Sequence, residues 1–157
     1  MEKLDKDFIK KVNIDKANNK TIGEIIIIGI SIATYIEPLI NGIFDFGIIF
    51  EVASLIFLLL ARKYMSKYDE IKAIRYIICS MLAIGWIIIY DIIFVFSLKN
   101  VDADVYGMGM ALTILYLTGL FAINKDLAKA ENPEKYKKST DWFYERSEEE
   151  NNEKNIR

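Results

Sequence analysis

Two acidic residues lie inside long apolar stretches of this sequence, where an isolated charge is costly. Glu51 interrupts the run IFDFGIIFEVASLIFLLLA at 43–61, and Asp91 interrupts the run at 73–98. In helices that rise about 1.5 Å per residue, Glu51 would lie about 12 Å and Asp91 about 10 Å from the outer ends of their runs. No Lys or Arg in these runs reaches that depth, so each carboxyl is expected to be protonated, hydrated or bound to a cation.

These carboxyl groups allow two interpretations, and the sequence leaves both open. In the first, Glu51 and Asp91 line a cavity that takes protons, cations or a cationic substrate. Asp45 and Glu37 would lie closer to the outer surface, and Ser54 shares the helical face of Glu51, which suits a polar crevice. In the second interpretation the acids are protonated and hydrogen-bond between helices, each bond contributing about 1 kcal/mol.

Four apolar stretches are long enough to be helices that cross a bilayer, whose hydrocarbon core is about 30 Å thick. They cover 21–40, 43–61, 73–98 and 107–124. Asn41-Gly42 is a turn pair that makes the first link very short. The sequence therefore predicts an all-α fold: a four-helix transmembrane bundle made of two helical hairpins, with 21–124 as its membrane domain.

The polar segment 1–20 carries apolar residues about one helical turn apart, with lysines between them. This pattern is typical of an amphipathic helix at a membrane interface, and it predicts such a segment on the cytoplasmic side. Thr21 is expected to cap the first spanning helix, with Glu24 as its partner in a capping box. The triplet Ser31-Ile32-Ala33 has the form of a signal-peptide cleavage site, but the apolar run continues past it, so we expect 21–40 to be retained.

The tail at 125–157 is charged, and after about residue 147 it has almost no apolar side chains, which predicts disorder there. Before that point lies the aromatic triplet Trp142-Phe143-Tyr144. Amphipathic aromatic rings favour the membrane interface. The triplet is therefore expected to anchor the tail at the cytoplasmic interface or to dock a protein partner.

Small residues at a spacing of four mark the expected contacts between helices. Gly29 and Ala33 form such a pair in the first stretch, and Gly107 and Ala111 form one in the fourth. Gly47 lies four residues before Glu51, on the same helical face. Packing inside the bundle is the favoured role of these residues, and contact between copies of the chain is the alternative.

The basic residues divide between alternate connections of the predicted helices. Of the 20 Lys and Arg residues, six precede the first stretch, and five lie at the connection between the second and third, with Arg75 at the start of the third. Eight follow the fourth stretch, and Lys99 is the one basic residue in the other two connections. Positively charged connections stay in the cytoplasm, so both termini and the middle connection are predicted to be cytoplasmic. In composition and topology the chain resembles small Ile-rich four-span membrane proteins of Gram-positive bacteria, which implies the bacterial cytoplasmic membrane.

Composition and motifs disfavour several classes of function. A net charge of −2 without a continuous basic face argues against a nucleic-acid partner. The sequence has no His and one cysteine, Cys79, which argues against a disulfide framework and a metal site. No catalytic or cofactor motif is present, so we expect neither an enzyme nor a cofactor.

We therefore predict a non-enzymatic accessory or interaction protein of the membrane, such as a subunit, a regulator or an immunity-type protein. It would contact the lipid bilayer, and a protein partner or a second copy of the chain, through its helices. The alternative is a small cation- or proton-linked transporter or channel that uses the intramembrane carboxyls.

Overall fold

Every regular element that the structure describes is an α-helix. The computed structural model describes residues 3–40, 42, 45–97 and 103–133, and at 3–5, 37, 38, 91, 94–97 and 103–109 it describes the backbone alone. The helices are α1 (Lys3–Thr34), α2 (Ile36–Ile40), α3 (Gly47–Met65), α4 (Glu70–Ser97) and α5 (Ala103–Glu131). The prediction of an all-α chain with four long helices is confirmed for the described residues.

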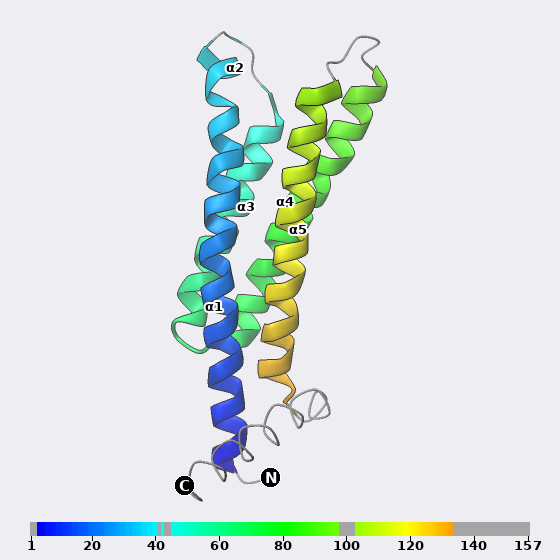
Figure 1. The fold of residues 1–157 in the computed structure, drawn as a ribbon. Coiled ribbons are helices and arrows are strands. Elements are labelled where there is room, and N and C mark those ends of the chain that lie inside the picture. Colours follow the sequence, from blue (N-terminus) through cyan, green and yellow to red (C-terminus); the bar gives the residue numbers. More distant parts are fainter. Residues whose placement is uncertain (1–2, 41, 43–44, 98–102, 134–157) are drawn as a thin grey trace, which may run out of the picture.

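The four long helices lie side by side in one bundle (Figure 1). Contacts join α1 to α3, α3 to α4, α4 to α5 and α5 back to α1, so each long helix packs against two neighbours. Helices α1 and α4 run in one direction and α3 and α5 in the other (Figure 1). We call the end where α1 begins and α5 ends the polar end, and the opposite end, where α2 lies, the α2 end.

Each long helix buries a narrow stripe of side chains at alternating spacings of three and four residues. This seven-residue pattern keeps one stripe facing the neighbouring helices, and it is typical of helices that pack nearly parallel or antiparallel. The stripes are Ile14, Ala17, Thr21, Glu24 and Ile28 in α1; Gly47, Glu51, Ser54, Leu58, Ala61 and Met65 in α3; Ala73, Ile77, Ser80, Ile84 and Ile87 in α4; and Thr113, Tyr116, Leu120, Ile123, Leu127 and Ala130 in α5.

Helix α1 is continuous through the point where the sequence predicts a helix start. The Thr21 hydroxyl donates a hydrogen bond of 2.8 Å to the carbonyl oxygen of Ala17, one turn earlier in the same helix. The predicted cap at Thr21 and the capping box with Glu24 are therefore wrong. Ile14 and Ala17 are fully buried in the core of the bundle, so tertiary packing holds the preceding polar segment in the helix.

The connection between α3 and α4 is shorter than the sequence predicts, because both helices extend into the charged region at 62–72. Asp69 lies just before α4 and accepts a hydrogen bond of 3.1 Å from the backbone N–H of Lys72. This bond, together with the nearby Lys72 ammonium, lowers the pKa of the Asp69 carboxyl below its ordinary value of 3.8. The Tyr64 and Tyr76 rings stack at 5.4 Å between centroids and hold the two helices together beside the turn.

Two described segments are long and apolar enough to cross a membrane, Glu70–Tyr90 in α4 and Met110–Glu131 in α5. Within the described residues, helices α1 and α3 contain no segment that is both long and apolar enough to cross a membrane. The 19 residues of α3 include Glu51, Arg62 and Lys63, and the apolar part of α1 ends at Thr34. Pro38 has no backbone N–H, so it cannot donate a helical hydrogen bond to the carbonyl oxygen of Thr34, four residues earlier.

Candidate functional site

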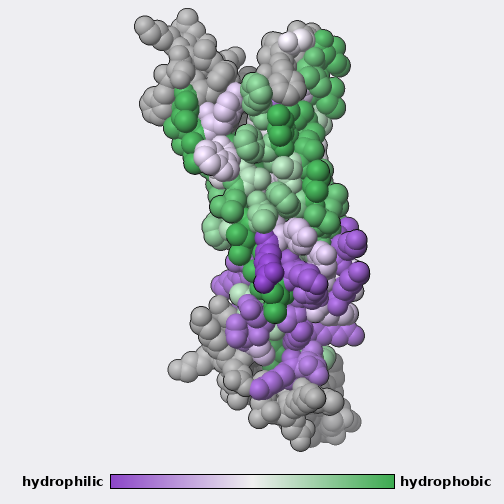
Figure 2. Space-filling model, turned by 180° about the vertical axis from the view of Figure 1, so that it is seen from behind, coloured by the Kyte–Doolittle hydropathy of each residue, from purple (hydrophilic) through white to green (hydrophobic). Residues whose placement is uncertain are grey.

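The surface of the bundle changes character along its length. On the face shown in Figure 2, the described surface is hydrophilic toward the polar end and hydrophobic above it. We call the exposed apolar residues of this upper region the apolar belt, and all four long helices contribute to it. The belt comprises Ile22, Ile26 and Ile30 of α1; Ile49, Val52, Ile56 and Leu59 of α3; Ile78, Leu82, Trp86 and Ile89 of α4; and Ile114, Leu115 and Phe121 of α5.

Polar side chains lie behind this belt, inside the bundle. We call them the polar column; its buried members are Glu24, Glu51, Ser54, Ser80, Thr113 and Tyr116. Polar side chains lie beside the buried Ile28, Ile84 and Ile87 under an apolar exterior, which differs from the usual arrangement of a water-soluble bundle. The polar column is therefore the candidate functional site. Three clusters contain all of these buried members except Thr113.

The first cluster surrounds Glu51, which lies in α3 and is 3% exposed. The Ser31 hydroxyl donates a hydrogen bond of 2.8 Å to Glu51 Oε1, and the Tyr35 hydroxyl lies 3.5 Å from the same oxygen. Gly47 leaves space at this point, because a Cβ there would lie 3.1 Å from the Tyr35 hydroxyl oxygen. These two donors to Glu51 therefore come from the region where α1 ends, and the predicted neighbour Ser54 belongs to a separate cluster.

The second cluster joins three hydroxyl groups from three helices. Ser54 Oγ of α3 lies 2.6 Å from Ser80 Oγ of α4, and Tyr116 Oη of α5 lies 3.1 Å from the first and 3.2 Å from the second. Ser80 also donates toward the backbone carbonyl of Ser54 at 3.2 Å. Each hydroxyl can both donate and accept, so this cluster ties α3, α4 and α5 together without any charge.

The third cluster is the contact of Glu24 with Gly119. Glu24 is 9% exposed, and a Cβ added to Gly119 would overlap its carboxyl group. The absence of a side chain at Gly119 thus makes room for the Glu24 carboxyl in the α1–α5 interface. The Oε2 atom of Glu24 is buried and has no hydrogen-bond partner among the described residues. Both Glu24 and Glu51 lie close enough to Tyr116 to interact electrostatically with its hydroxyl.

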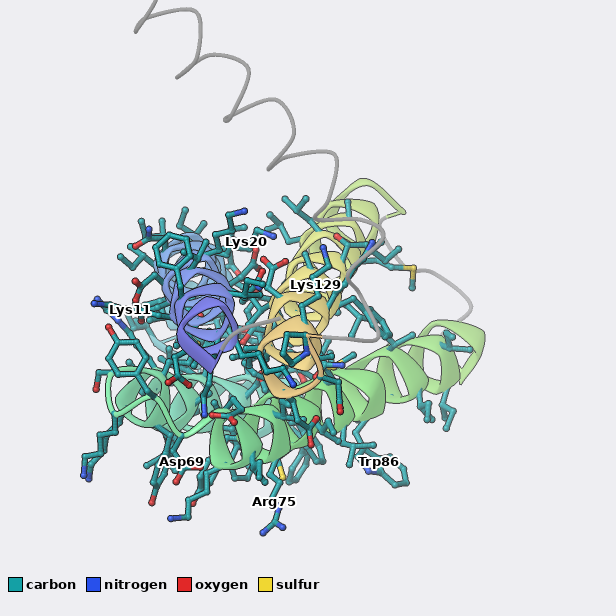
Figure 3. The ribbon with its side chains drawn as sticks, turned by 90° about the horizontal axis from the view of Figure 1, so that it is seen from below. Lys11, Lys20, Asp69, Arg75, Trp86 and Lys129 are labelled. Carbon is teal, nitrogen blue, oxygen red and sulfur yellow. The ribbon has the colours of Figure 1, made fainter. Side chains whose placement is uncertain are left out.

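Below Glu24, ion pairs connect the helices at the polar end. Lys20 of α1 pairs with Asp126 of α5 at 2.5 Å, and Lys10 of α1 pairs with Glu70 of α4 at 2.7 Å. Figure 3, viewed from this end, shows the labelled Lys11 and Arg75 pointing outward from α1 and α4, with Trp86 also pointing outward from α4. A pocket of about 380 Å³ opens here, lined by Lys6, Asp7, Lys10, Glu70, Ala130, Glu131, Asn132 and Pro133.

The structure accounts for several of the other predicted site residues. Asp45 Oδ1 accepts a hydrogen bond of 2.7 Å from the backbone N–H of Gly47, so Asp45 holds the first turn of α3. Gly29 and Ala33 are exposed, and a Cβ on Gly29 would meet nothing within 4 Å. The expected packing of this pair inside the bundle is therefore absent. Ala111 is exposed as well.

Some predicted residues lie outside what the structure describes. The side chains of Glu37 and Asp91 and the surroundings of Gly107 fall in this group, although the backbones of these residues lie in α2, α4 and α5. The triplet Trp142-Phe143-Tyr144 lies beyond residue 133, outside the described residues.

Sequence reasoning missed Glu24, Gly119, Ser80 and Tyr116 as members of the site. Glu24 was assigned to a capping box because the helix start was placed at Thr21. The signal that finds it is the α1 stripe, since Ile14, Ala17, Thr21 and Ile28 share its spacing of three and four. In chemical terms the column offers carboxyl and hydroxyl groups that accept and donate protons, on helices that hold them behind an apolar exterior.

No protein-family model, no curated protein and no solved structure matches this chain.

Proposed function

We propose that this chain is a four-span protein of the bacterial cytoplasmic membrane that acts as a non-enzymatic accessory or interaction protein. The observation that carries the membrane placement is the apolar belt, to which all four long helices contribute exposed side chains around a polar interior. Helices with apolar outer faces are stable in lipid and aggregate in water. Helices α1 and α3 then cross the bilayer beside α4 and α5, although α1 and α3 alone lack sufficient apolar length.

The basic residues support one orientation of this bundle. Lysines and arginines from the start of α1, the α3–α4 connection and the end of α5 gather at the polar end. Positive charge near spanning helices is retained in the cytoplasm, so the polar end is cytoplasmic. The α2 end then faces the outside of the cell.

The accessory role would be carried by the polar end, where charged side chains of α1, α4 and α5 surround an open pocket. To test this, a photo-reactive amino acid is placed at Glu131, beside the pocket, in cells that express the protein. A matched probe replaces the exposed Ile56 in the apolar belt. We expect a discrete protein adduct from position 131 and only lipid adducts from position 56. Absence of any protein adduct at position 131 would contradict the accessory role.

A second function, proton- or cation-linked transport, is favoured by the two buried carboxyls. Glu24 and Glu51 both lie in the polar column, on either side of the hydroxyl cluster formed by Ser54, Ser80 and Tyr116. Intramembrane acids that face the interior of a bundle mark ion and proton pathways in many transporters. Flux across vesicles that contain the purified protein tests this candidate: Glu51→Gln abolishes flux if the column conducts, and leaves it unchanged if the column is structural.

A further inference from the structure

The Glu24 carboxyl has the features of a binding site that its protein neighbours leave incomplete. It is nine-tenths buried, it fits against a glycine on the facing helix, and its Oε2 atom has no hydrogen-bond partner among the described residues. A buried oxygen that accepts no hydrogen bond is costly. The cost is relieved when the oxygen carries a proton or meets a donor.

Two more buried acceptor atoms lie on the same two helices. Asn18 Oδ1 of α1 and Asn124 Oδ1 of α5 are buried and also lack hydrogen-bond partners among the described residues. The register of α1 and α5 is set by the Glu24–Gly119 contact and the Lys20–Asp126 pair, and both asparagines lie within one turn of that pair. These unpartnered atoms are all acceptors, so they call for a ligand that donates: a proton at the carboxyl and water at the amides.

We propose that Glu24 is a proton-binding site, and that it exchanges its proton with water at the polar end along the α1–α5 interface past Asn124, Asn18 and the Lys20–Asp126 pair. In the exchange, the O–H bond of the neutral carboxyl breaks and the proton passes to a water molecule, leaving the carboxylate. The reverse step restores the acid. This inference rests on the membrane placement proposed above, because the apolar belt then closes every other route to water.

Among the residues that the structure describes, the charged and titratable groups near Glu24 leave it without a permanent counterion. Lys20 of α1 is engaged by Asp126 of α5, Tyr116 of α5 is neutral in the hydroxyl cluster, and Glu51 of α3 carries the same sign as Glu24. Helix α4 contributes the uncharged Ser80. A neutral, protonated Glu24 is therefore the stable form in this setting.

A metal cation fits this site less well than a proton. Hard cations such as Ca²⁺ take about six to eight oxygen ligands, with several carboxylates among them. Among the described residues no group of three or more His, Cys, Asp or Glu side chains converges. A proton requires one carboxylate oxygen, which Glu24 supplies.

The proposal is tested with dicyclohexylcarbodiimide, an apolar reagent that enters bilayers and adds covalently to protonated carboxyls. The full chain is reconstituted in lipid vesicles, and the labelled peptides are measured by mass spectrometry. At about pH 6 we expect Glu24 to label about ten times faster than the exposed Glu131, because an ordinary carboxyl is ionised there. The rate should fall about tenfold per pH unit once the pH exceeds the pKa of Glu24.

Two variants and one salt series complete the measurement. We expect Glu24→Gln to abolish labelling of the peptide that contains position 24. The matched Glu51→Gln should leave the labelling of Glu24 unchanged. Sodium added at constant pH leaves the rate unchanged. Labelling of Glu24 no faster than that of Glu131, or slowed by sodium, would overturn the assignment as a proton site.

The side of exchange is tested by a pH difference across the vesicle membrane. A cysteine in place of Lys67 reports which compartment bathes the polar end, after Cys79→Ser. We expect Glu24 labelling to follow the pH of that compartment. If it follows the opposite compartment, the proposed route is wrong. If the belt is shown to lie in lipid and Glu24 does not label, this inference fails while the membrane placement stands.

Discussion

At the polar end the bundle buries mainly apolar side chains such as Ile14, Met65 and Leu127, with Asn13 and Asp126, and exposes lysines and acids. Nearer the α2 end it buries Glu51, Ser54 and Ser80 beside Ile84 and Ile87, and it exposes isoleucine and leucine. The same seven-residue stripe runs through both regions. What changes between the two regions is the polarity of the side chains that are buried in the stripe and of those that are exposed around it. The comparison shows that the spacing of the buried residues sets how the helices pack, whereas the types of the exposed residues set whether a helix face suits water or lipid.

The comparison explains why the polar column is tolerated. In water, burying a hydroxyl forfeits its hydrogen bonds to solvent, so an apolar interior is preferred. In lipid the exterior offers no hydrogen bonds either, so Ser54, Ser80 and Tyr116 gain by meeting each other inside the bundle. Each such contact contributes about 0.6 kcal/mol in membrane proteins.

The largest expected effect comes from placing a charge on each of the two exteriors. Leu82 in the belt and Ile71 near the polar end both lie on α4 and are 63% and 50% exposed. We expect Leu82→Asp to destabilise insertion by about 3 kcal/mol, because a carboxylate near the centre of a spanning helix loses its hydration. Ile71→Asp should change stability by less than about 0.5 kcal/mol. Membrane insertion and unfolding in bicelles measure both, and equal effects would remove the distinction between the two regions.

A smaller effect is expected from filling the space at Gly119. Gly119→Ala introduces a Cβ that overlaps the Glu24 carboxyl, and we expect it to destabilise the α1–α5 contact by about 1–3 kcal/mol. Gly29→Ala is the matched control, because a Cβ there meets nothing and alanine favours the helix. In the Glu24→Ala background the cost of Gly119→Ala should disappear. A cost that persists would show that the glycine accommodates something other than Glu24.

The smallest expected effect concerns Asp69 at the turn of the polar end. Its folded-state pKa is lowered by the hydrogen bond from the Lys72 backbone, so its stabilisation is complete above its ordinary pKa of 3.8 and is lost as the pH falls through the lower folded value. Asp69→Asn should therefore lower Tm slightly at neutral pH and remove an acid-induced drop in Tm of about the same size. Identical acid profiles for both proteins would rule out this contribution.

The helix types and the number of long helices followed from apolar length alone, but the start of the first helix did not. The predicted break at Thr21 rested on local capping chemistry, and burial of Ile14 and Ala17 in the core of the bundle overrode it. That error also hid Glu24, because a capping role required no partner on another helix. Gly119 and Tyr116 were unpredictable for a different reason: their roles depend on the rotation of α5, which one sequence does not specify.

The central claim is that the apolar belt lies in lipid while the polar end lies in water. After Cys79→Ser, spin labels on single cysteines at Ile56, Leu82 and Leu115 are compared with labels at Lys63, Lys67 and Lys125, all in lipid nanodiscs. The first three positions are exposed in the belt, and the second three are exposed near the polar end. The account predicts that the belt labels collide with oxygen and are shielded from a water-soluble nickel complex, with the reverse at the polar end. Nickel access to the belt equal to that at the polar end would contradict the account.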